Sequence, residues 1–220
     1  MKLSRFYPVF DSSQWIARLV PLGIKLVQLR IKDKPQSHIR AEILKAKEIC
    51  EKHGCTLVIN DYWRLAIELG CDWIHLGQED LDSADMAQIK EANIKVGVST
   101  HDLEELLRAY QLEPDYIALG PVYPTILKKM KWHQQGLGRV TEWKEKMADT
   151  PLVAIGGMSV ERAEGAFAAG ADIVAAVTDI TLNKNPEQRI IEWLEACDIT
   201  VNREFVQDFA NQNAQQEESA

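Results

Sequence analysis

The sequence predicts an α/β protein in which eight strand–helix units close into a single (β/α)8 barrel. Apolar runs of strand length alternate with segments of helical periodicity along nearly the whole chain, and such alternation builds a parallel sheet. Eight units is the number that closes a barrel. The chain has 220 residues, of which 46% are hydrophobic, and α/β barrels of this size are routinely one domain. We therefore expect a barrel domain over residues 1–198 and a polar tail over residues 199–220.

Each predicted strand is a short apolar or alternating run that ends at turn or helix-capping residues. The predicted strands are 6–10, 25–32, 55–59, 73–77, 95–98, 115–119, 151–155 and 172–177. Pro8 lies inside the first strand and removes one hydrogen-bond donor from its ladder.

The predicted helices follow these strands and are bounded by capping residues and glycines. They comprise a segment up to residue 22, then 37–53, a short helix ending at 69, and 84–92, 102–112, 141–147, 159–169 and 186–196. Asp11, Ser12 and Ser13 are good N-caps for the first helix, and Gly23 ends it. Gly54 ends the second helix in the same way. A longer connection, 121–138, follows the sixth strand.

The strand at residues 25–32 has a cationic stripe. One face carries Val27, Leu29 and Ile31, and the other carries Leu26, Gln28, Arg30 and Lys32. In isolation this pattern is more typical of an antiparallel strand with its polar face in water. In a parallel barrel both faces are covered, so the stripe is expected to be enclosed. Enclosed cations need anionic partners, and the strand itself has no acid, which favours an anionic ligand.

Polar residues follow most of the predicted strands at their carboxyl ends. They include Gln28, Arg30 and Lys32; Asn60 and Asp61; Gln78, Glu79 and Asp80; Ser99, Thr100 and His101; Pro124, Thr125 and Lys128; Gly156 and Gly157; and Val177 and Thr178. The active site of a (β/α)8 barrel lies at the carboxyl ends of its strands. The sequence therefore predicts one site that these residues share.

Two carboxylates in this set suggest a metal site. Asp61 and Asp80 follow neighbouring strands and can reach one cation, and hard oxygen ligands with room for water and phosphate suit Mg²⁺. The alternative is that either Asp only caps the helix after it. The nearby Arg30 and Lys32 favour the metal, because a metal and cations at one point are the usual means of holding a diphosphate.

The turns after strands seven and eight suggest a second anion site. Gly156-Gly157 and Val177-Thr178 occupy positions where barrels often offer backbone N–H groups to a phosphate. A Gly-Gly pair alone is as often only a tight turn. Two anion sites at one mouth would imply two phosphorylated ligands or one bisphosphate.

Composition excludes several functional classes. The net charge of −8 and a pI near 5.2 argue against nucleic acid as a partner. Four cysteines, Cys50, Cys55, Cys71 and Cys197, show no spacing suited to zinc, which indicates reduced, packed thiols. No apolar stretch is long enough to span a membrane. We expect a soluble, cytoplasmic protein that acts on small molecules.

The tail differs in composition from the barrel units. Val201, Phe205 and Phe209 fit one face of a short amphipathic turn. Residues 211–220 are rich in Gln, Asn and Glu and lack apolar anchors, so we expect them to be disordered.

A series of motifs resembles the thiamine phosphate synthase family, in order and at family-like spacing, over roughly residues 6–197. The motifs are Val-Gln-Leu-Arg-Ile-Lys-Asp, Val-Ile-Asn-Asp-Tyr, His-Leu-Gly-Gln-Glu-Asp-Leu, Gly-Val-Ser-Thr-His, Ile-Ala-Leu-Gly-Pro-Val-Tyr-Pro-Thr, Ala-Ile-Gly-Gly-Met and Gly-Ala-Asp-Ile-Val. The resemblance implies a TIM barrel that joins 4-amino-5-hydroxymethyl-2-methylpyrimidine diphosphate to 4-methyl-5-hydroxyethylthiazole phosphate, usually in its carboxylated form. It also implies Mg²⁺ as cofactor and leaves a homo-oligomer open.

The resemblance assigns roles to particular residues. It implies that Gln28, Arg30, Lys32, Asn60, Ser99 and Lys128 contact the pyrimidine diphosphate, that Thr125, Gly157, Val177 and Thr178 serve the thiazole phosphate, and that Leu29, Ile31, Ile126 and Leu127 complete the substrate-binding set. Arg30, Lys32, Lys128 and Ser99 would be catalytic, and Asp61 and Asp80 would hold Mg²⁺. His75 is expected to be structural, and His101 is expected near a helix start.

The chain also departs from the family pattern. The family commonly has Pro-Thr-x-Thr-Lys, whereas Leu127 replaces the second Thr here, and Thr178 stands where Ser is usual. Residues 129–135 are unusual for a loop that closes over substrate. Two alternatives remain at this point: a related thiazole tautomerase, against which the diphosphate and metal residues argue, and a non-catalytic barrel that binds thiazole or thiamine phosphate.

Overall fold

Eight parallel strands form a closed barrel, in a computed structural model that describes residues 3–125, 133–147 and 149–207. The strands are β1 (Phe6–Phe10), β2 (Leu26–Leu29), β3 (Thr56–Asn60), β4 (Trp73–Leu76), β5 (Lys95–Thr100), β6 (Tyr116–Leu119), β7 (Leu152–Ile155) and β8 (Ile173–Ala176). Each strand pairs with the next along the chain, and β8 pairs with β1. The predicted (β/α)8 TIM barrel is confirmed.

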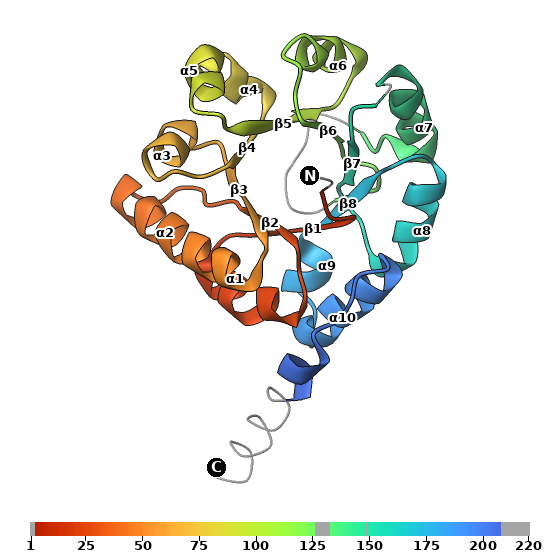
Figure 1. The fold of residues 1–220 in the computed structure, drawn as a ribbon. Helices are drawn as coiled ribbons and strands as arrows, with labels where there is room; N and C mark the ends of the chain where they lie inside the picture. The colour runs from red at the N-terminus through yellow and green to blue at the C-terminus, as the bar shows by residue number, and fades with distance from the viewer. Residues whose placement is uncertain (1–2, 126–132, 148, 208–220) are drawn as a thin grey trace.

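Helices form a ring around the strands (Figure 1). They are α1 (Ser13–Leu19), the 3-10 helix η1 (Val20–Leu22), α2 (Gln36–His53), α3 (Trp63–Glu68), α4 (Gln78–Leu81), α5 (Met86–Glu91), α6 (Leu103–Tyr110), α7 (Gly136–Lys146), α8 (Val160–Ala168), α9 (Thr178–Thr181) and α10 (Pro186–Ala196). The short helices α4 and α9 were not predicted, because four residues are too few to show a helical period. None of the described helices is long and apolar enough to cross a membrane.

The strands bury both of their faces, as the parallel sheet requires. One layer packs between the strands and the helices and contains, for example, Val27 and Leu29. A separate inner cluster consists of Tyr7, Leu26, Val58, Trp73, Tyr116, Ala118, Val153, Ile173 and Ala175. The predicted alternation of side chains between the two faces of the second strand is therefore correct as far as Leu29, where β2 ends.

Tyr116 fills the inside of the barrel at a place that a glycine leaves open. A Cβ atom on Gly97 would lie 1.9 to 2.3 Å from atoms of the Tyr116 ring. The two residues are paired across β5 and β6, and the ring is fully buried. The sequence Lys-Val-Gly-Val-Ser thus has its glycine where a large inward-facing neighbour needs the space.

The chain stays attached to the barrel beyond the predicted boundary at residue 198. The backbone N–H of Asn202 donates to the carbonyl of Leu22 at 2.8 Å, and Val201 is buried. Phe205 packs against the same apolar layer, so two residues of the predicted amphipathic turn are in place. Phe209 and the stretch 211–220, which we expect to be disordered, lie outside the described residues.

The contact between Gly97 and Tyr116 gives a first prediction. We expect Gly97→Ala to lower the free energy of unfolding by about 1–3 kcal/mol, because the new methyl group overpacks the barrel interior. Denaturant unfolding followed by circular dichroism measures this change.

Gly138→Ala is a matched control, since a Cβ at this exposed position in α7 meets nothing within 4 Å. That substitution should be neutral or should stabilise by up to about 1 kcal/mol. Equal stability of Gly97→Ala and the wild type would show that Tyr116 does not pack against this glycine.

Candidate active site

The carboxyl ends of β2, β3 and β4 bring charged residues together at the barrel mouth. Lys32 forms an ion pair with Asp61, and the carboxyl group of Asp61 lies close enough to that of Asp80 to raise the pKa of Asp80. Burial raises the pKa of Tyr62. The charges of four nearby residues also act on this pKa, and they are Lys32, Asp61, Asp33 and Arg30. Residues from three consecutive units therefore meet, as the sequence predicts.

The cations in this group are less enclosed than the sequence suggests. β2 ends at Leu29, so Arg30 and Lys32 lie in the loop after the strand and have exposed side chains. The backbone N–H of Arg30 still donates to the carbonyl of Phe10 at 2.7 Å, which fixes the start of the loop. Lys32 does have a protein acid as partner, but this acid comes from the next unit and not from its own strand.

Asp61 occupies a special backbone position. Its φ of 65° is in the left-handed region, which Asp tolerates better than most residues. Its backbone N–H donates to the carbonyl of His75 at 2.9 Å. The turn after β3 is thereby tied to β4 and holds the carboxylate over the mouth.

Asp80 combines the two roles that the sequence left open. Its carboxylate accepts a hydrogen bond from the backbone N–H of Gly77 at 3.0 Å, so it caps α4. Burial raises the pKa of Asp80, and the neighbouring Asp61 raises it further. Two adjacent carboxylates of this kind are stabilised by a cation, and Lys32 supplies only one positive charge.

The donor set fits Mg²⁺ better than a fully protein-ligated metal. Among the described residues, no group of three or more His, Cys, Asp or Glu side chains could hold an ion. Mg²⁺ commonly takes one or two carboxylates and completes its shell with water and substrate oxygens. Asp61 and Asp80 match that pattern.

Two buried polar atoms at the mouth lack a partner within the described part of the chain. They are the amide nitrogen Nδ2 of Asn60, a donor, and the amide oxygen Oε1 of Gln78, an acceptor. Asn60 is only 5% exposed. Because buried polar groups are nearly always hydrogen-bonded, these two atoms indicate contacts with a bound ligand or its water.

A chain of hydrogen bonds crosses the barrel interior beneath this mouth. Gln28 Nε2 donates to the Tyr7 hydroxyl (2.8 Å), which bonds to the Tyr116 hydroxyl (2.9 Å). Tyr116 in turn bonds to His75 Nδ1 (2.8 Å), and His75 Nε2 bonds to Ser99 Oγ (2.7 Å). Burial lowers the pKa of His75 to about 4, so the ring is neutral at physiological pH.

The first donor fixes the direction of the whole chain. The amide nitrogen of Gln28 can only donate, so the Tyr7 oxygen accepts there. Because the buried Tyr7 proton also needs an acceptor, we expect Tyr7 to donate to Tyr116 and Tyr116 to donate to Nδ1 of His75. The neutral ring then carries its proton on Nε2 and donates to Ser99. The hydroxyl proton of Ser99 remains available for an acceptor in the mouth.

The predicted second anion site lies on the side formed by β6, β7 and β8. Both glycines of the Gly156-Gly157 turn have positive φ, at 93° and 62°. A Cβ on Gly157 would lie 2.4 Å from the carbonyl oxygen of Pro124, so this turn touches the segment that leads to Thr125. Val177 and Thr178 follow β8, the neighbour of β7, and are half-buried.

Some predicted site residues are not at the mouth or cannot be placed. The side chains of Leu29 and Ile31 are buried in the layer between strands and helices, which leaves only their backbone groups for a ligand. Gln28 is 4% exposed and is engaged with Tyr7. Ile126, Leu127 and Lys128 lie outside the described residues.

Sequence reasoning missed the two tyrosines that connect Gln28 to His75. Tyr7 and Tyr116 stand at inward-facing positions of β1 and β6, where most barrel residues are apolar. A phenol at such a position needs a hydrogen-bond partner, and this requirement is the feature of the sequence that could have identified both tyrosines. His75 is buried in the wall as expected, but it also orients Ser99, and His101 lies at the start of α6 as expected.

Comparison with known proteins gives a consistent result. The model of the family described as thiamine monophosphate synthase matches residues 7–180. The chain is 57% identical to the thiamine-phosphate synthase of Rhizobium etli over 196 residues, which cover 89% of this chain and 96% of that protein. It is 47% identical to the enzyme of the same name from Salmonella schwarzengrund over 175 residues, or 80% of this chain and 83% of that protein.

A solved structure titled thiamine phosphate pyrophosphorylase from Pyrococcus furiosus superposes with a TM-score of 0.79. That comparison covers 88% of this chain and 95% of the other, at 22% sequence identity, and at this identity it supports the fold alone.

The raised pKa of Asp80 gives a prediction about stability. The folded protein holds this proton more tightly than the unfolded chain, so the contribution of Asp80 to the free energy of unfolding falls as pH rises from the ordinary carboxyl range through the raised pKa. We expect Asp80→Asn to remove this pH-dependent loss of stability. Melting temperatures of the metal-free proteins between about pH 4 and 7 measure it.

Asp82→Asn is the control, because Asp82 is exposed and is paired with Arg108 on the protein surface. If Asp80→Asn melts well below the wild type at neutral pH, the cap on the Gly77 N–H outweighs the repulsion from Asp61.

The direction of the hydrogen-bond chain gives another prediction. In the wild type, ¹⁵N NMR of the imidazole should show His75 neutral and protonated on Nε2. Tyr116→Phe should lower the free energy of unfolding by about 1–3 kcal/mol, because it leaves buried groups of Tyr7 and His75 unpaired. Tyr110→Phe, at a 45% exposed site on α6, is the control. A wild-type ring protonated on Nδ1 would contradict the direction.

Proposed function

The chain belongs to the thiamine monophosphate synthase family of transferases, and we propose that it joins 4-amino-5-hydroxymethyl-2-methylpyrimidine diphosphate to 4-methyl-5-hydroxyethylthiazole phosphate or its carboxylated form. The products are thiamine phosphate and pyrophosphate. The observation that best supports this reaction is the meeting of Arg30, Lys32, Asp61 and Asp80 at one point of the mouth. Such a mixture of cations and paired carboxylates suits a metal-bound diphosphate better than a single phosphate.

We infer that Asp61 and Asp80 hold Mg²⁺ between them. When bound, the ion neutralises the diphosphate and stabilises it as a leaving group. Lys32, which pairs with Asp61 in this structure, would be placed to share its charge with a diphosphate oxygen. Arg30 offers a planar fork of N–H donors to the same anion, and Lys128 would add a third cation.

The residues below the diphosphate orient the pyrimidine. The Ser99 hydroxyl proton, which the hydrogen-bond chain leaves free, can be donated to a ring nitrogen. The unpartnered Nδ2 of Asn60 is a second donor, on β3, which is separated from the β5 strand of Ser99 by β4. Fixed donors of this kind hold the ring in one orientation while its bond to the diphosphate breaks.

No side-chain nucleophile is needed. The C–O bond to the diphosphate breaks, the electron pair leaves with the pyrophosphate, and the electron-rich aminopyrimidine stabilises the methylene cation. The thiazole nitrogen then donates its lone pair and forms the new N–C bond. The chain contributes by binding both substrates in line and by neutralising the leaving group.

The second substrate would place its phosphate against Thr125, Gly157, Val177 and Thr178. The contact of Gly157 with the Pro124 carbonyl and the pairing of β7 with β8 support this grouping. The substrates are small and diffusible, and the four free, buried cysteine thiols support a reducing compartment such as the cytoplasm.

The decisive experiment supplies both substrates and Mg²⁺ and measures release of pyrophosphate and formation of thiamine phosphate. We expect steady turnover by the wild type. Asp61→Asn should lower kcat by about 100-fold or more and raise the Mg²⁺ requirement, because it removes a preorganised charge. Asp82→Asn, at the exposed C-cap of α4 two residues after Asp80, should leave both unchanged.

Two results would overturn the proposal. Binding of thiazole phosphate without any pyrophosphate release would make the protein a binding barrel. An unchanged Mg²⁺ dependence in Asp61→Asn would remove the assigned metal site.

A further inference from the structure

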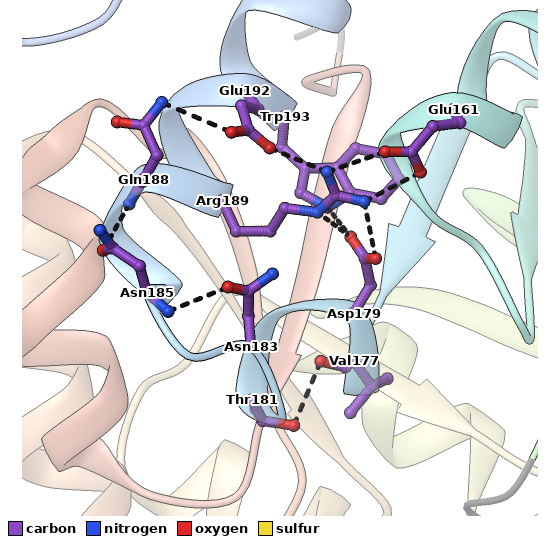
Figure 2. Close-up of polar contacts among 10 residues, drawn as sticks. All are labelled: Glu161, Val177, Asp179, Thr181, Asn183, Asn185, Gln188, Arg189, Glu192 and Trp193. Atoms are coloured by element: carbon purple, nitrogen blue, oxygen red, sulfur yellow. Dashed lines mark hydrogen bonds and ion pairs between the residues drawn. The ribbon is translucent and has the colours of Figure 1, made fainter.

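Arg189, on α10, binds carboxylates from two other helices (Figure 2). Its Nε and Nη2 donate to the two oxygens of Asp179, on α9, at 2.8 and 2.9 Å. Its Nη1 and Nη2 donate to the two oxygens of Glu161, on α8, at 3.0 and 2.9 Å. A bond from Nη1 to Glu192 at 2.8 Å uses the fifth N–H, so the guanidinium is fully satisfied.

The contact of Arg189 with Asp179 is sheltered and anchored, whereas the side chain of Glu161 is 69% exposed. The side chain of Arg189 is 13% exposed and that of Asp179 is 15% exposed. The indole N–H of Trp193 donates to Asp179 at 2.8 Å, and the Trp193 ring stacks on Phe6 of β1 with centroids 5.0 Å apart. Two-pronged pairs of Arg with carboxylates have a fixed geometry, so they set the position of α8 and α9 relative to α10.

The two helices held in this way begin at or shortly after the residues assigned to the thiazole phosphate: α9 begins at Thr178, and α8 begins at Val160, three residues after Gly157. Asp179 is the residue after Thr178. Glu161 is in the first turn of α8, which follows the Gly156-Gly157 turn. The side-chain hydrogen bonds of Arg189 go to Asp179, Glu161 and Glu192, and not to Gly157 or Thr178, so it acts on the start of each segment that follows them.

We propose that Arg189 is a positioning residue for the second, thiazole-phosphate subsite: it sets the spacing of the Gly157 and Thr178 segments and neutralises the acids beside them. This inference rests on the proposed function of that subsite.

Arg189 also has an electrostatic effect, in addition to its effect on the positions of α8 and α9. Three carboxylates surround one guanidinium, and two of them belong to the segments that would hold a phosphate dianion. Hydrogen bonds from Arg189 lower the pKa of Glu161 to about 2, and hydrogen bonds to Asp179 and Glu161 raise the pKa of Arg189. Without Arg189 the acids would stay charged, would lose their partner, and would repel the phosphate.

The test separates this role from a merely structural one by comparing the two substrates. Arg189→Lys keeps the charge but loses the two-pronged geometry, and Arg189→Gln loses both. We expect the KM for thiazole phosphate to rise roughly 10- to 100-fold in Arg189→Gln, the scale of losing charged hydrogen bonds, and less in Arg189→Lys. The KM for the pyrimidine diphosphate should stay within about twofold, since the described residues assigned to it lie on β2, β3 and β5 and in the loop after β2, away from α8, α9 and α10.

Glu192→Gln is the matched control. It removes one negative charge beside Arg189 within α10 and leaves both inter-helix pairs intact, so both KM values should stay at the wild-type level. The double variant Arg189→Gln/Asp179→Asn should recover part of the affinity lost in Arg189→Gln, because it removes the repelling charge. Melting temperatures establish that each variant is folded.

A direct binding measurement distinguishes failure of this inference from failure of the proposed function. Inorganic phosphate should raise the melting temperature of the wild type, and this gain should be lost in Arg189→Gln. Equal effects on both KM values, or no recovery in the double variant, would make Arg189 a structural clamp while the synthase reaction stands. If the wild type lacks synthase turnover but the phosphate effect still depends on Arg189, the reaction fails and the positioning role stands.

Discussion

The closed barrel buries both faces of every strand, and this single constraint determines where polar chemistry can occur. A polar side chain that points inward cannot reach water along the wall of the barrel, so it needs a partner from another strand. The bonds from Gln28 through Tyr7, Tyr116 and His75 to Ser99 meet this need across five strands. The result is a mouth residue whose hydroxyl is oriented by the scaffold before any substrate binds.

The sequence predicted the elements well because strand and helix periods are local properties. It also predicted which turns meet at the mouth, since parallel strands share one carboxyl end. It could not predict partners that depend on register and loop path: Lys32 pairs with Asp61 only because β2 ends at Leu29, and Tyr116 meets His75 only because Gly97 leaves room between them. The helices α4 and α9 escaped prediction for a similar reason, because they are defined by caps and tertiary contacts and not by a repeat.

Two groups of acids near the proposed site are paired in different ways. Around Arg189, five N–H groups meet five carboxylate contacts, so every hydrogen-bond donor of the guanidinium has a protein acceptor. Around Asp61 and Asp80, two acids share one lysine, and the pKa of Asp80 is raised. A cluster in which every donor has an acceptor suits a supporting role, whereas a cluster with too few donors for its carboxylates attracts a cation from solution. The difference in pairing, and not the number of acids, therefore separates the scaffold from the reactive part of the site.

The two substrates would accordingly be supported by different parts of the molecule. In the proposed assignment, the pyrimidine would be oriented from inside the barrel, by side chains of β1, β2, β4, β5 and β6 that bond to one another through its centre. The thiazole phosphate would be held from outside, by α10 acting on the first turns of α8 and α9. Because the two supports share no side-chain contact among the described residues that form them, a change in one should leave the other substrate's binding geometry nearly intact. A reaction that must bring two separately bound molecules into line benefits from this arrangement, since each half can be preorganised without straining the other.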